Sequence, residues 1–438
     1  MPKGLRSLTF SFDGAGLTRY GGMVLFHRFC KQLGLRRALQ RQISWPYVGR
    51  EYAPVDLFLA QLFALVVGLG RIENVRALKW NGLLPALLGL KSFPHPVTLR
   101  RFLHHWTPVH LQSLQTVHDR LRRHVWTFMI PLYSAILDAD TTVLTVFGNQ
   151  EGAVLGYNPT HRGRKSFAPL LLFENRSGLS MAAEWRSGNV HSSTGLFPMI
   201  KHSLNVLPST VAASRIRFRG DNAFYDGQFI RFLDEKRIGY TIVARMTAPL
   251  RRELEHIRFH PFRPGYSIGH LKYQPHTWKR PATIVATRRD LRNLPDPRQP
   301  DLLVSKRYGY HAVATNLALT PENTIHFYNS RAQQELIFRE LKSDSTLACI
   351  PTRRFHSNAF YLELILWAYD LVTLFQRTCL NQSCQNWTLH TIQREVWGLP
   401  ALLLHTNNKN QLRLPPNFPH QDLFALAQRR LRSIRPLG

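Results

Sequence analysis

The sequence predicts an α/β core that carries a β-rich insertion and is flanked by helical N-terminal and C-terminal regions. Strand-like segments rich in β-branched residues begin near residue 131 and alternate with a helical segment, which is typical of an α/β domain. Residues 247–325 are rich in Pro, Arg and short β-like runs, as in a separate insertion. Helical patterns dominate before residue 131 and after residue 330.

Charge gives the first indication of a partner. The chain has 57 Lys and Arg residues against 27 Asp and Glu residues, a formal net charge of +30. Such a chain repels itself unless a polyanion neutralises it. Its basic residues run along the whole length, which favours nucleic acid over an anionic membrane surface. The third possibility is that the basic residues only face solvent and bind no polyanion.

The length of 438 residues suits several domains, and the patterns above place their boundaries. We expect a helical DNA-binding region at 1–130, the first part of the core at 131–246, the β-rich insertion at 247–325, a helix completing the core at 326–345, and a helical basic region at 346–438.

The cysteines and the most apolar segment point to a cytoplasmic protein. Cys30, Cys349, Cys379 and Cys384 lack the CxxC spacing of a zinc site, so we expect reduced thiols. Residues 1–14 contain no apolar run of the kind found in signal peptides. Glu363 and Asp370 interrupt the apolar run 360–375, which predicts a buried core helix and no contact with a membrane.

Two helices are predicted in the N-terminal region. Pro54–Val67 is apolar enough for a buried helix that Gly68 and Gly70 end. A second helix is expected after Thr98 as its N-cap, and it carries Arg100 and Arg101. This helix is either the DNA-facing helix of a helix-turn-helix-like unit or an ordinary amphipathic helix with solvated arginines.

In the core and the insertion, strand-like composition alternates with one helical pattern. Strands are expected at 134–146, 168–173, 179–185, 216–218, 238–244, 282–287 and 312–319, and a helix at 228–236.

Two aspartates lie within the first predicted strand. Side chains alternate faces along a strand, so Asp138 and Asp140 share one face. Two neighbouring carboxylates repel each other and are costly to bury unless a cation compensates them. The pair therefore indicates either a divalent metal site or a solvated sheet edge.

A third aspartate, Asp221, follows Gly220 just past another predicted strand. Ligand-binding groups commonly lie at the carboxyl ends of strands in open α/β sheets. The alternative is that Asp221 caps the next helix, but Asp226 is the better N-cap candidate because it directly precedes the predicted helix.

The most specific pattern is Tyr-x2-Arg-x3-Glu-x6-Lys, formed by Tyr328, Arg331, Glu335 and Lys342. Ser330 and Gln333 are spaced as a capping box, which predicts a helix start here. At about 100° per residue, Arg331, Glu335 and Lys342 fall on one stripe of that helix. Leu336, Ile337 and Leu341 fall on another side and are expected to face a core. The alternative is a surface helix with one Arg–Glu pair.

This spacing resembles the Tyr–Arg–Glu–Lys signature of a group of bacterial insertion-sequence transposases. The segments 137–142 and 219–225 resemble the two Asp motifs of that group, and Gly156-Tyr157-Asn158-Pro159 and Arg186-Ser187-Gly188-Asn189 are similar to further features of it. The resemblance covers about residues 130–380. It implies a DDE transposase with a ribonuclease H-like catalytic core, in which a β-rich insertion separates the second Asp from the Glu.

The resemblance implies a catalytic triad of Asp140, Asp221 and Glu335 that binds two Mg²⁺ ions, with Mn²⁺ as a substitute. Carboxylates are the hard oxygen ligands that Mg²⁺ prefers. One ion would activate water or a 3′-hydroxyl, and the other would stabilise the leaving oxygen. Asp138 keeps the first position open, and Asp140 is preferred because Thr141 follows it.

Several further residues are expected to contact DNA. Arg331 and Lys342 would hold phosphates near the scissile position, and Tyr328 would position or stack on the DNA. Arg162 and Lys165 belong to a basic loop that either follows the DNA backbone or is simply solvated. Trp278, in the insertion, is either a core residue or an aromatic that stacks on a flipped base.

The expected function is DNA cleavage and strand transfer in cut-and-paste transposition. The partners would be double-stranded DNA, namely transposon terminal inverted repeats and a target, bound by a homodimer at the nucleoid. Two alternatives remain open at this stage. One is a catalytically inactive sequence-specific DNA-binding protein, and the other is a ribonuclease H-like nuclease without strand transfer.

Overall fold

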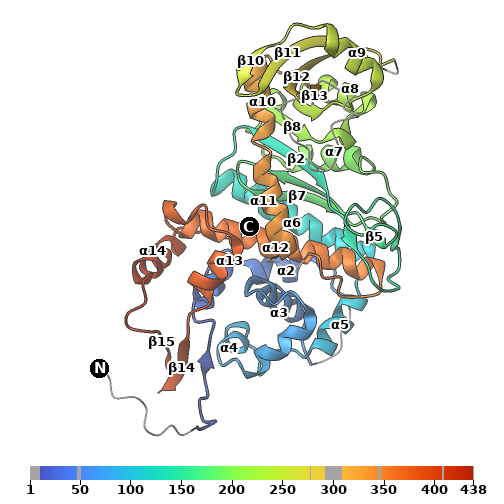
Figure 1. Cartoon of the computed structure of the whole chain (residues 1–438). Helices are drawn as coiled ribbons and strands as arrows, with labels where there is room; N and C mark the ends of the chain where they lie inside the picture. Colours follow the sequence, from blue (N-terminus) through green and yellow to red (C-terminus); the bar gives the residue numbers. More distant parts are fainter. Residues whose placement is uncertain are drawn as a thin grey trace. The chain divides into compact units, whose positions relative to one another are not determined.

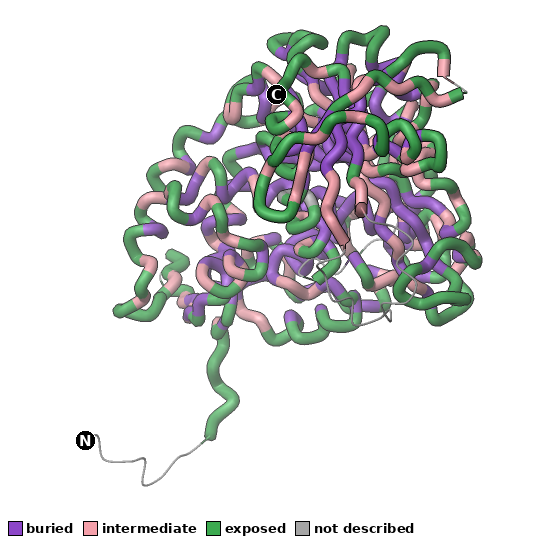
Figure 2. The backbone as a smooth tube through the Cα atoms, turned by 45° about the horizontal axis from the view of Figure 1, so that its top comes forward, coloured by how far each residue is buried: buried purple, intermediate pink, exposed green. Residues whose placement is uncertain are grey.

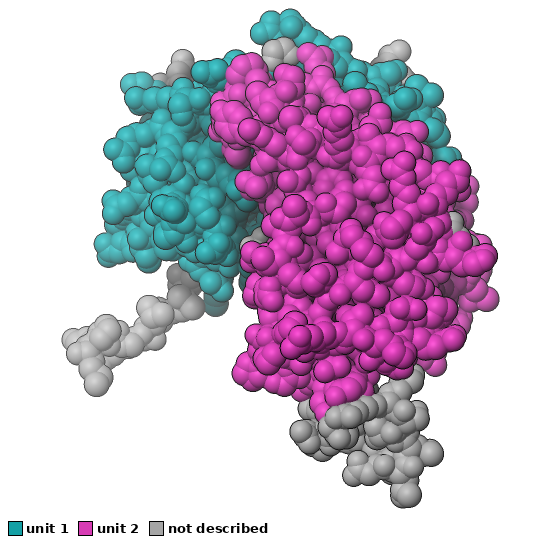
Figure 3. Space-filling view, turned by 90° about the horizontal axis from the view of Figure 1, so that it is seen from above, with its two compact units in different colours: residues 1–118, 340–438 teal, residues 119–339 magenta. Residues whose placement is uncertain are grey.

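The computed structural model describes residues 10–46, 51–276, 278–291, 308–343, 347–406 and 409–437, apart from the side chains of residues 333 and 334 (Figure 1). The chain divides into two compact units, residues 1–118 with 340–438 and residues 119–339 (Figure 3). Both boundaries fall within helices, α6 (Pro108–Phe128) and α11 (Ala332–Ser343).

The first unit is mainly helical. Its helices are α1 (Met23–Gln32), α2 (Leu35–Gln42), α3 (Pro54–Val66), η1 (Ile72–Trp80), α4 (Leu84–Leu88), α5 (Pro96–His104), α12 (Phe355–Cys379), η5 (Gln382–Cys384), α13 (Leu389–Ile392), η6 (Gln393–Trp397) and α14 (Gln421–Leu431). β1 (Leu17–Thr18), β14 (Ala401–Thr406) and β15 (Lys409–Arg413) form a small sheet in the order β1-β14-β15. The C-terminal region, expected to be helical, also contains the strands β14 and β15.

Helix α12 is the centre of the first unit, as the apolar run at 360–375 predicted. It is long and apolar enough to cross a membrane by length and composition, but 94% of its most apolar window is buried inside the protein. The two carboxylates in this run share one buried partner. His118 Nδ1 lies 2.6 Å from Glu363 Oε1, and His118 Nε2 lies 3.0 Å from Asp370 Oδ2. Pairing thus explains how a core helix contains two acids.

The two helices predicted near the N-terminus are both present. Helix α3 is buried and ends before Gly68, whose positive φ of 84° suits glycine. Helix α5 begins earlier than predicted, because the Nδ1 atom of His95 accepts a hydrogen bond from the Val97 amide and makes His95 the N-cap. The proposed N-cap, Thr98, lies inside the helix since Pro96 fits the first helical position.

The second unit is built on a nine-stranded sheet in the order β10-β11-β12-β13-β9-β8-β2-β6-β7. Its strands are β2 (Ala135–Thr141), β6 (Leu170–Glu174), β7 (Leu179–Glu184), β8 (Ile216–Gly220), β9 (Gly239–Val243), β10 (His260–Arg263), β11 (Tyr266–Tyr273), β12 (Ala282–Asp290) and β13 (Tyr308–Thr315). Strands β2, β8 and β9 are parallel to one another, and the other neighbours pair antiparallel.

The remaining elements of the second unit surround this sheet. They are α7 (Leu196–Val206), η2 (Ala213–Arg215), η3 (Asn222–Phe224), α8 (Gly227–Glu235), α9 (Ala248–His256) and α10 (Pro321–Asn329), with a small sheet in the order β3-β5-β4 from β3 (Leu144–Thr145), β4 (Val154–Leu155) and β5 (Lys165–Phe167). Strands β2, β6, β8 and β9 consist largely of buried residues, the class drawn in purple in Figure 2, whereas β10 and β11 are mostly intermediate or exposed. Every strand predicted from composition is present, with shifted ends.

The segment 247–325 is β-rich, but it does not form a sheet of its own. Strand β13 pairs antiparallel with β9, from Val313 opposite Val243 to Thr315 opposite Thr241. Strands β10, β11 and β12 then continue the sheet outward. The insertion is therefore joined to the core by an unbroken ladder of main-chain hydrogen bonds.

Candidate active site

Strand β2 places Asp138 and Asp140 in different surroundings, although both point to the same face. Asp138 is fully buried, and the guanidinium of Arg219 donates to both of its oxygens at 2.6 Å. Asn175 donates to Oδ2 at 3.0 Å. Burial raises the pKa of Asp138, and Arg219 opposes this effect. Asp138 is thus an internal partner of Arg219, which leaves Asp140 as the reachable carboxylate of the strand.

Asp140 lies near the carboxyl end of β2, with its side chain 24% exposed. Its Oδ1 accepts a hydrogen bond of 2.8 Å from the Thr141 amide, and its Oδ2 lies 3.0 Å from Arg331 Nη2. Burial raises the pKa of Asp140, the charge of Arg331 lowers it, and the charge of Asp221 raises it. Asp140 therefore feels both a cation and a second carboxylate.

Asp221 directly follows β8, which runs parallel to β2. The carboxyl ends of both strands therefore meet at one edge of the sheet. Asp221 Oδ1 accepts a hydrogen bond of 3.0 Å from the Ala223 amide and caps the short η3 turn. Asp226 caps α8 by accepting from the Gln228 and Phe229 amides, as predicted. Asp221 is thus a cap as well as a neighbour of Asp140.

Arg331 pairs with Asp140 and lies close enough to Asp221 for that charge to raise its pKa. Its side chain is 9% exposed, and its Nη2 donates to the Ala139 carbonyl at 2.9 Å. Burial acts to lower the pKa of Arg331, but the charges of Asp140, Tyr328, Asp138 and Asp221 together raise it. The pKa of the Tyr328 phenol is also raised, mainly because the side chain is buried. The charges of Asp221 and Asp140 raise it further, and the charge of Arg331 lowers it.

The Tyr–Arg–Glu–Lys segment is not one helix. Tyr328 belongs to α10, Glu335 and Lys342 belong to α11, and Arg331 lies in the two-residue junction. Ser330 is not the predicted N-cap, because its hydroxyl donates to the Phe327 carbonyl at the end of α10.

The predicted stripe and core face of this helix need correction for the same reason. Arg331 is buried in the junction, whereas Glu335 is exposed one turn later. Leu336 is 49% exposed, and Phe338 and Leu341 form the buried side of α11 instead. Because α11 begins at Ala332, Arg331 lies outside the helix that carries Glu335 and Lys342.

Glu335 does not complete a metal-binding group in this conformation. Within the described ranges, no set of three or more His, Cys, Asp or Glu side chains is arranged to hold a metal ion. The structure thus brings together Asp140, Asp221, Arg331 and Tyr328, with Glu335 on the helix that follows. Asp140 and Asp221 supply hard oxygen donors of the kind that a magnesium ion needs. In this conformation, however, the third charged group beside them is the guanidinium of Arg331 and not a carboxylate.

Arg219 is the functional neighbour that the sequence patterns missed. Besides Asp138 on β2, its Nη1 donates to the Phe327 carbonyl at 3.0 Å and to the Ser330 hydroxyl. One buried guanidinium therefore connects the strand before Asp221, the strand of Asp140 and the junction that carries Arg331. The role of Arg219 follows from the register of the parallel strands β2 and β8, in which Arg219 lies opposite Asp138.

Loops around Asp140 are held by close backbone contacts and by Arg186. A Cβ on Gly156 would come within 1.9 Å of the Gly188 carbonyl oxygen, so the two motifs noted at 156–159 and 186–189 touch through glycines. Arg186 is buried and donates to the Thr141 hydroxyl at 3.0 Å and to the Ala168 carbonyl at 2.9 Å. Both motifs therefore support the end of β2.

The other residues expected to contact DNA lie in varied settings. Arg162 and Lys165 are exposed at and before β5, Arg101 is exposed on α5, and Lys342 is exposed in the last turn of α11. Arg100 forms an ion pair with Glu73 inside the first unit.

Trp278 is half-buried and packs against its own chain. Its ring centroid lies 4.8 Å from that of Tyr225, and a Cβ on Gly227 would come within 2.7 Å of its Cδ1. In this structure the Trp278 ring therefore packs against Tyr225 and not against a base.

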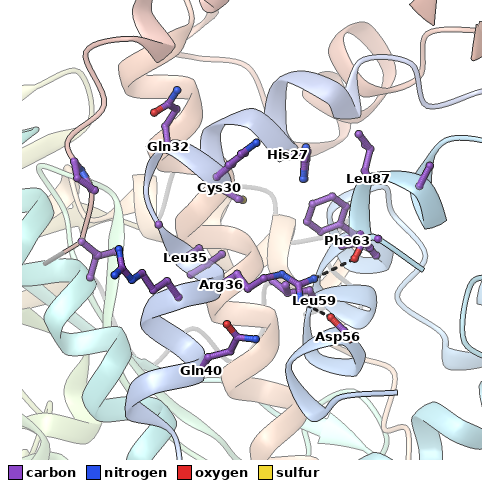
Figure 4. Close-up of a pocket in the computed structure, with 18 residues that line it drawn as sticks. His27, Cys30, Gln32, Leu35, Arg36, Gln40, Asp56, Leu59, Phe63 and Leu87 are labelled. Carbon is purple, nitrogen blue, oxygen red and sulfur yellow. Dashed lines mark hydrogen bonds and ion pairs between the residues drawn. The ribbon is translucent and has the colours of Figure 1, made fainter. Parts of the chain in front are cut away.

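A cavity of about 830 Å³ lies in the first unit and is lined by none of the predicted site residues (Figure 4). Arg36 and Asp56 form an ion pair of 2.5 Å at its wall, and His27, Cys30 and Phe63 line it. Burial and the nearby cations Lys31, Arg36 and Arg28 lower the pKa of His27. Asp56 is the only carboxylate in the described lining, so the cavity does not resemble a catalytic acid cluster.

Comparison with known proteins gives the family of the chain. A solved structure of a piggyBac transposase synaptic complex with hairpin DNA is similar over 87% of this chain and 81% of that chain, with 12% identity and a TM-score of 0.49. No curated protein matches the chain. The family described as transposase DDE domain group 1 matches residues 2–436. Because that match spans nearly the whole sequence, the chain belongs to the DDE transposase family.

Proposed function

We propose that this protein is the transposase of a bacterial insertion sequence, which binds terminal inverted repeats and cuts and rejoins DNA. The observation that carries the proposal is the meeting of Asp140, Asp221 and Arg331 at the carboxyl ends of two parallel strands. The hairpin of β6 and β7 beside β2, followed by parallel β8 and β9, supports a ribonuclease H-like core.

Asp140, Asp221 and Glu335 are the residues that would hold divalent cations, Mg²⁺ with Mn²⁺ as a substitute. When bound, such ions activate the attacking oxygen and stabilise the leaving oxygen of an in-line displacement at phosphorus. The partly exposed side chain of Asp140 and its proximity to Asp221 support this assignment. Glu335 would join them through a movement of α11, because it is exposed in the present conformation.

The other residues act on the DNA. Arg331 neutralises Asp140 and Asp221 and presents a guanidinium beside the position of the scissile phosphate. Tyr328, next to it, orients the strand. Lys342, Arg162, Lys165 and Arg101 are exposed and suit contacts with the backbone. Arg100 and Trp278 already have partners within the chain, so a DNA contact would require them to change partners.

The wider setting follows from the same proposal. The partners are transposon-end DNA and target DNA, and a homodimer at the bacterial nucleoid would hold two ends together. The net charge of +30 supports a polyanionic partner.

A supercoiled-plasmid assay with the element's own terminal repeats tests the proposal. We expect the wild-type protein to give joined products with Mg²⁺ present. Binding without cleavage would indicate an inactive DNA-binding protein, and cleavage without joining would indicate a nuclease.

Asp221→Asn sharpens this test, with Asp226→Asn as the matched control. We expect Asp221→Asn to abolish cleavage and leave repeat binding nearly intact, because it removes a ligand and no phosphate contact. Asp226 caps α8, so its substitution should cost about 1 kcal/mol of stability at most and keep cleavage. Equal cleavage by both variants would show that Asp221 is only a cap.

A further inference from the structure

The outer strands of the large sheet carry arginines that lie over aromatic rings. The guanidinium carbon of Arg263 lies 4.1 Å from the ring centroid of Tyr266, and that of Arg289 lies 5.4 Å from the same centroid. Arg288 lies between two rings, 4.3 Å from Phe259 and 4.5 Å from Tyr308. We call Phe259, Arg263, Tyr266, Arg288, Arg289 and Tyr308 the arginine–aromatic cluster.

Strand register explains why this cluster forms. Tyr266 lies opposite Arg289 across β11 and β12, and Asp290 lies opposite Tyr308 across β12 and β13. Opposite residues in antiparallel strands present their side chains to the same face. Arg289 therefore meets Tyr266 on one face, while Arg288 and Tyr308 meet on the other.

Residues from both faces border a hollow of about 590 Å³ at the end of these strands, where the β10–β11 turn, the end of β12 and the start of β13 meet. Arg263, Tyr266, Arg288, Tyr308 and Asp290 are among the residues that line it. Within the described ranges, no ion pair joins Arg263, Arg288 or Arg289 to a carboxylate, and Asp290 is the carboxylate in the lining. The hollow therefore has more positive than negative side chains.

The geometry of these arginines suits phosphate. The guanidinium carbons lie 4.1–5.4 Å from the ring centroids, within the range of the cation–π attraction, and each guanidinium has five N–H donors. Because the ring fixes the side chain, less conformational entropy is lost when those N–H groups bind an oxyanion. A guanidinium already lies near each of the rings of Phe259, Tyr266 and Tyr308, which favours contact with phosphates over stacking on bases.

We propose that the arginine–aromatic cluster binds the phosphodiester backbone of DNA, as a contact surface separate from the carboxylates at the ends of β2 and β8. This rests on the proposed function in one respect, namely that DNA is the partner. It requires neither a divalent cation nor an intact Asp140 and Asp221.

The cluster is also connected to the segment before Arg331. Phe262, which lines the hollow, packs against a buried group formed by Ile268, Val285, Val313 and Ile325. Tyr328 packs against the same group. A contact between DNA and the cluster would therefore act on residues that pack against the same hydrophobic group as Tyr328 at the end of α10.

The test compares Arg263→Gln/Arg288→Gln with Arg252→Gln/Arg258→Gln. Both double variants remove two charges from the insertion, but Arg252 and Arg258 are exposed residues outside the hollow. Binding is measured by fluorescence anisotropy in EDTA over a salt series, with a 20-base-pair duplex of arbitrary sequence and with one of its single strands.

We expect the cluster variant to reduce the slope of log affinity against log salt by about two, and the control to keep the wild-type slope. A reduced slope with the duplex identifies double-stranded backbone as the ligand, and one with the single strand alone identifies unpaired DNA. Equal slopes for the cluster variant and the control, with both probes, would overturn the proposal.

A measurement on the wild-type protein guards against misfolding of the cluster variant. Hydrogen exchange of residues 259–267 and 285–290 should slow when the probe is added, and unchanged exchange there would also overturn the proposal. Asp140→Asn/Asp221→Asn should keep the wild-type salt slope. Loss of strand transfer in that variant concerns the proposed active site alone, so the two ideas fail separately.

Discussion

Strand β2 carries two aspartates, Asp138 and Asp140, and each pairs with an arginine from another part of the chain. The two pairs differ in how deeply they are buried. In the pair of Arg219 with Asp138, both side chains are 0% exposed, and two hydrogen bonds of 2.6 Å join them. In the pair of Arg331 with Asp140, the side chains are 9% and 24% exposed, and one contact of 3.0 Å joins them.

The difference separates a structural role from a chemical one. A fully buried ion pair cannot lose one partner without leaving an uncompensated charge in a medium of low polarity. A pair at the surface can exchange its partner for a metal ion, a phosphate or water. Residue type and strand face are the same for Asp138 and Asp140, so burial and the partners of each carboxylate distinguish them.

Asp140→Asn should show the largest effect. We expect cleavage of end-containing plasmid to fall by about 10⁴-fold or more, which corresponds to about 5.5 kcal/mol in the barrier. Stability should change little, because the lost attraction to Arg331 is offset by lost repulsion from Asp221. The measurements are single-turnover cleavage and urea unfolding, and near-normal cleavage would contradict the division of roles between Asp138 and Asp140.

Arg219→Leu should have the next largest effect, on stability. Removing the guanidinium leaves the Asp138 carboxylate buried without its cation, so we expect a loss of about 3–5 kcal/mol in the free energy of unfolding.

Arg217→Leu is the matched control for Arg219→Leu, since Arg217 lies on the same strand, half-buried, and donates to the Ser214 carbonyl at 2.6 Å. Its loss should stay below about 1.5 kcal/mol. In the double variant Asp138→Leu/Arg219→Leu, much of the stability should return, because no charge remains buried. If the double variant were as unstable as Arg219→Leu, charge burial would not be the cause.

Arg331→Gln should have an intermediate effect on activity. A charge-assisted contact to phosphate contributes about 1–3 kcal/mol, so cleavage should slow by roughly one to two orders of magnitude. Raising the Mg²⁺ concentration should not restore the rate, because Arg331 is no metal ligand. Full rescue by metal would mean that Arg331 acts only by neutralising Asp140 and Asp221.

The smallest effect is expected at a third acid–base pair, where one partner is exposed. His202 Nε2 lies 2.7 Å from Asp119 Oδ2, and the His202 side chain is 53% exposed. The hydrogen bond to Asp119 raises the pKa of His202 above its usual 6.5, while burial opposes the shift. Because the folded pKa is the higher one, the stabilisation is fully present below pH 6.5 and is lost as pH rises through the folded pKa.

Chemical unfolding of wild type and His202→Gln between pH 5 and 9 measures this contribution. The wild-type advantage should be a fraction of 1 kcal/mol at acid pH, as expected of a half-exposed pair, and should disappear at alkaline pH. An advantage that grows with pH would have the wrong sign for this pair.

Local patterns predicted the strands and most helices correctly, because alternation and β-branched composition report directly on half-buried strands. That Asp140 and Asp221 would lie close together was expected from the resemblance to DDE transposases, not from local patterns. The break between α10 and α11 was not predictable in this way. It depends on Arg219, which is more than 100 residues earlier in the chain and holds Ser330 and Phe327 in place.

Asp138 shows a second limit of local patterns. Its alternation with Asp140 gives the correct face of β2, but its burial depends on Arg219 in a neighbouring strand. Likewise, the composition of 247–325 indicated strands but not that β13 would pair with β9. Both outcomes depend on which distant strands become neighbours, and a single sequence read by local pattern contains no such information.

The pairing of β13 with β9 also sets a condition on how this protein can be shortened. Excising the outer strands and joining the chain before α9 directly to α10 would leave β9 as an edge strand with unpaired N–H and C=O groups along Thr241, Ile242 and Val243. An uncovered edge of this kind pairs readily with other chains and promotes aggregation. The insertion therefore protects the core from self-association, so a soluble minimal core would need a new charged or covered edge at β9.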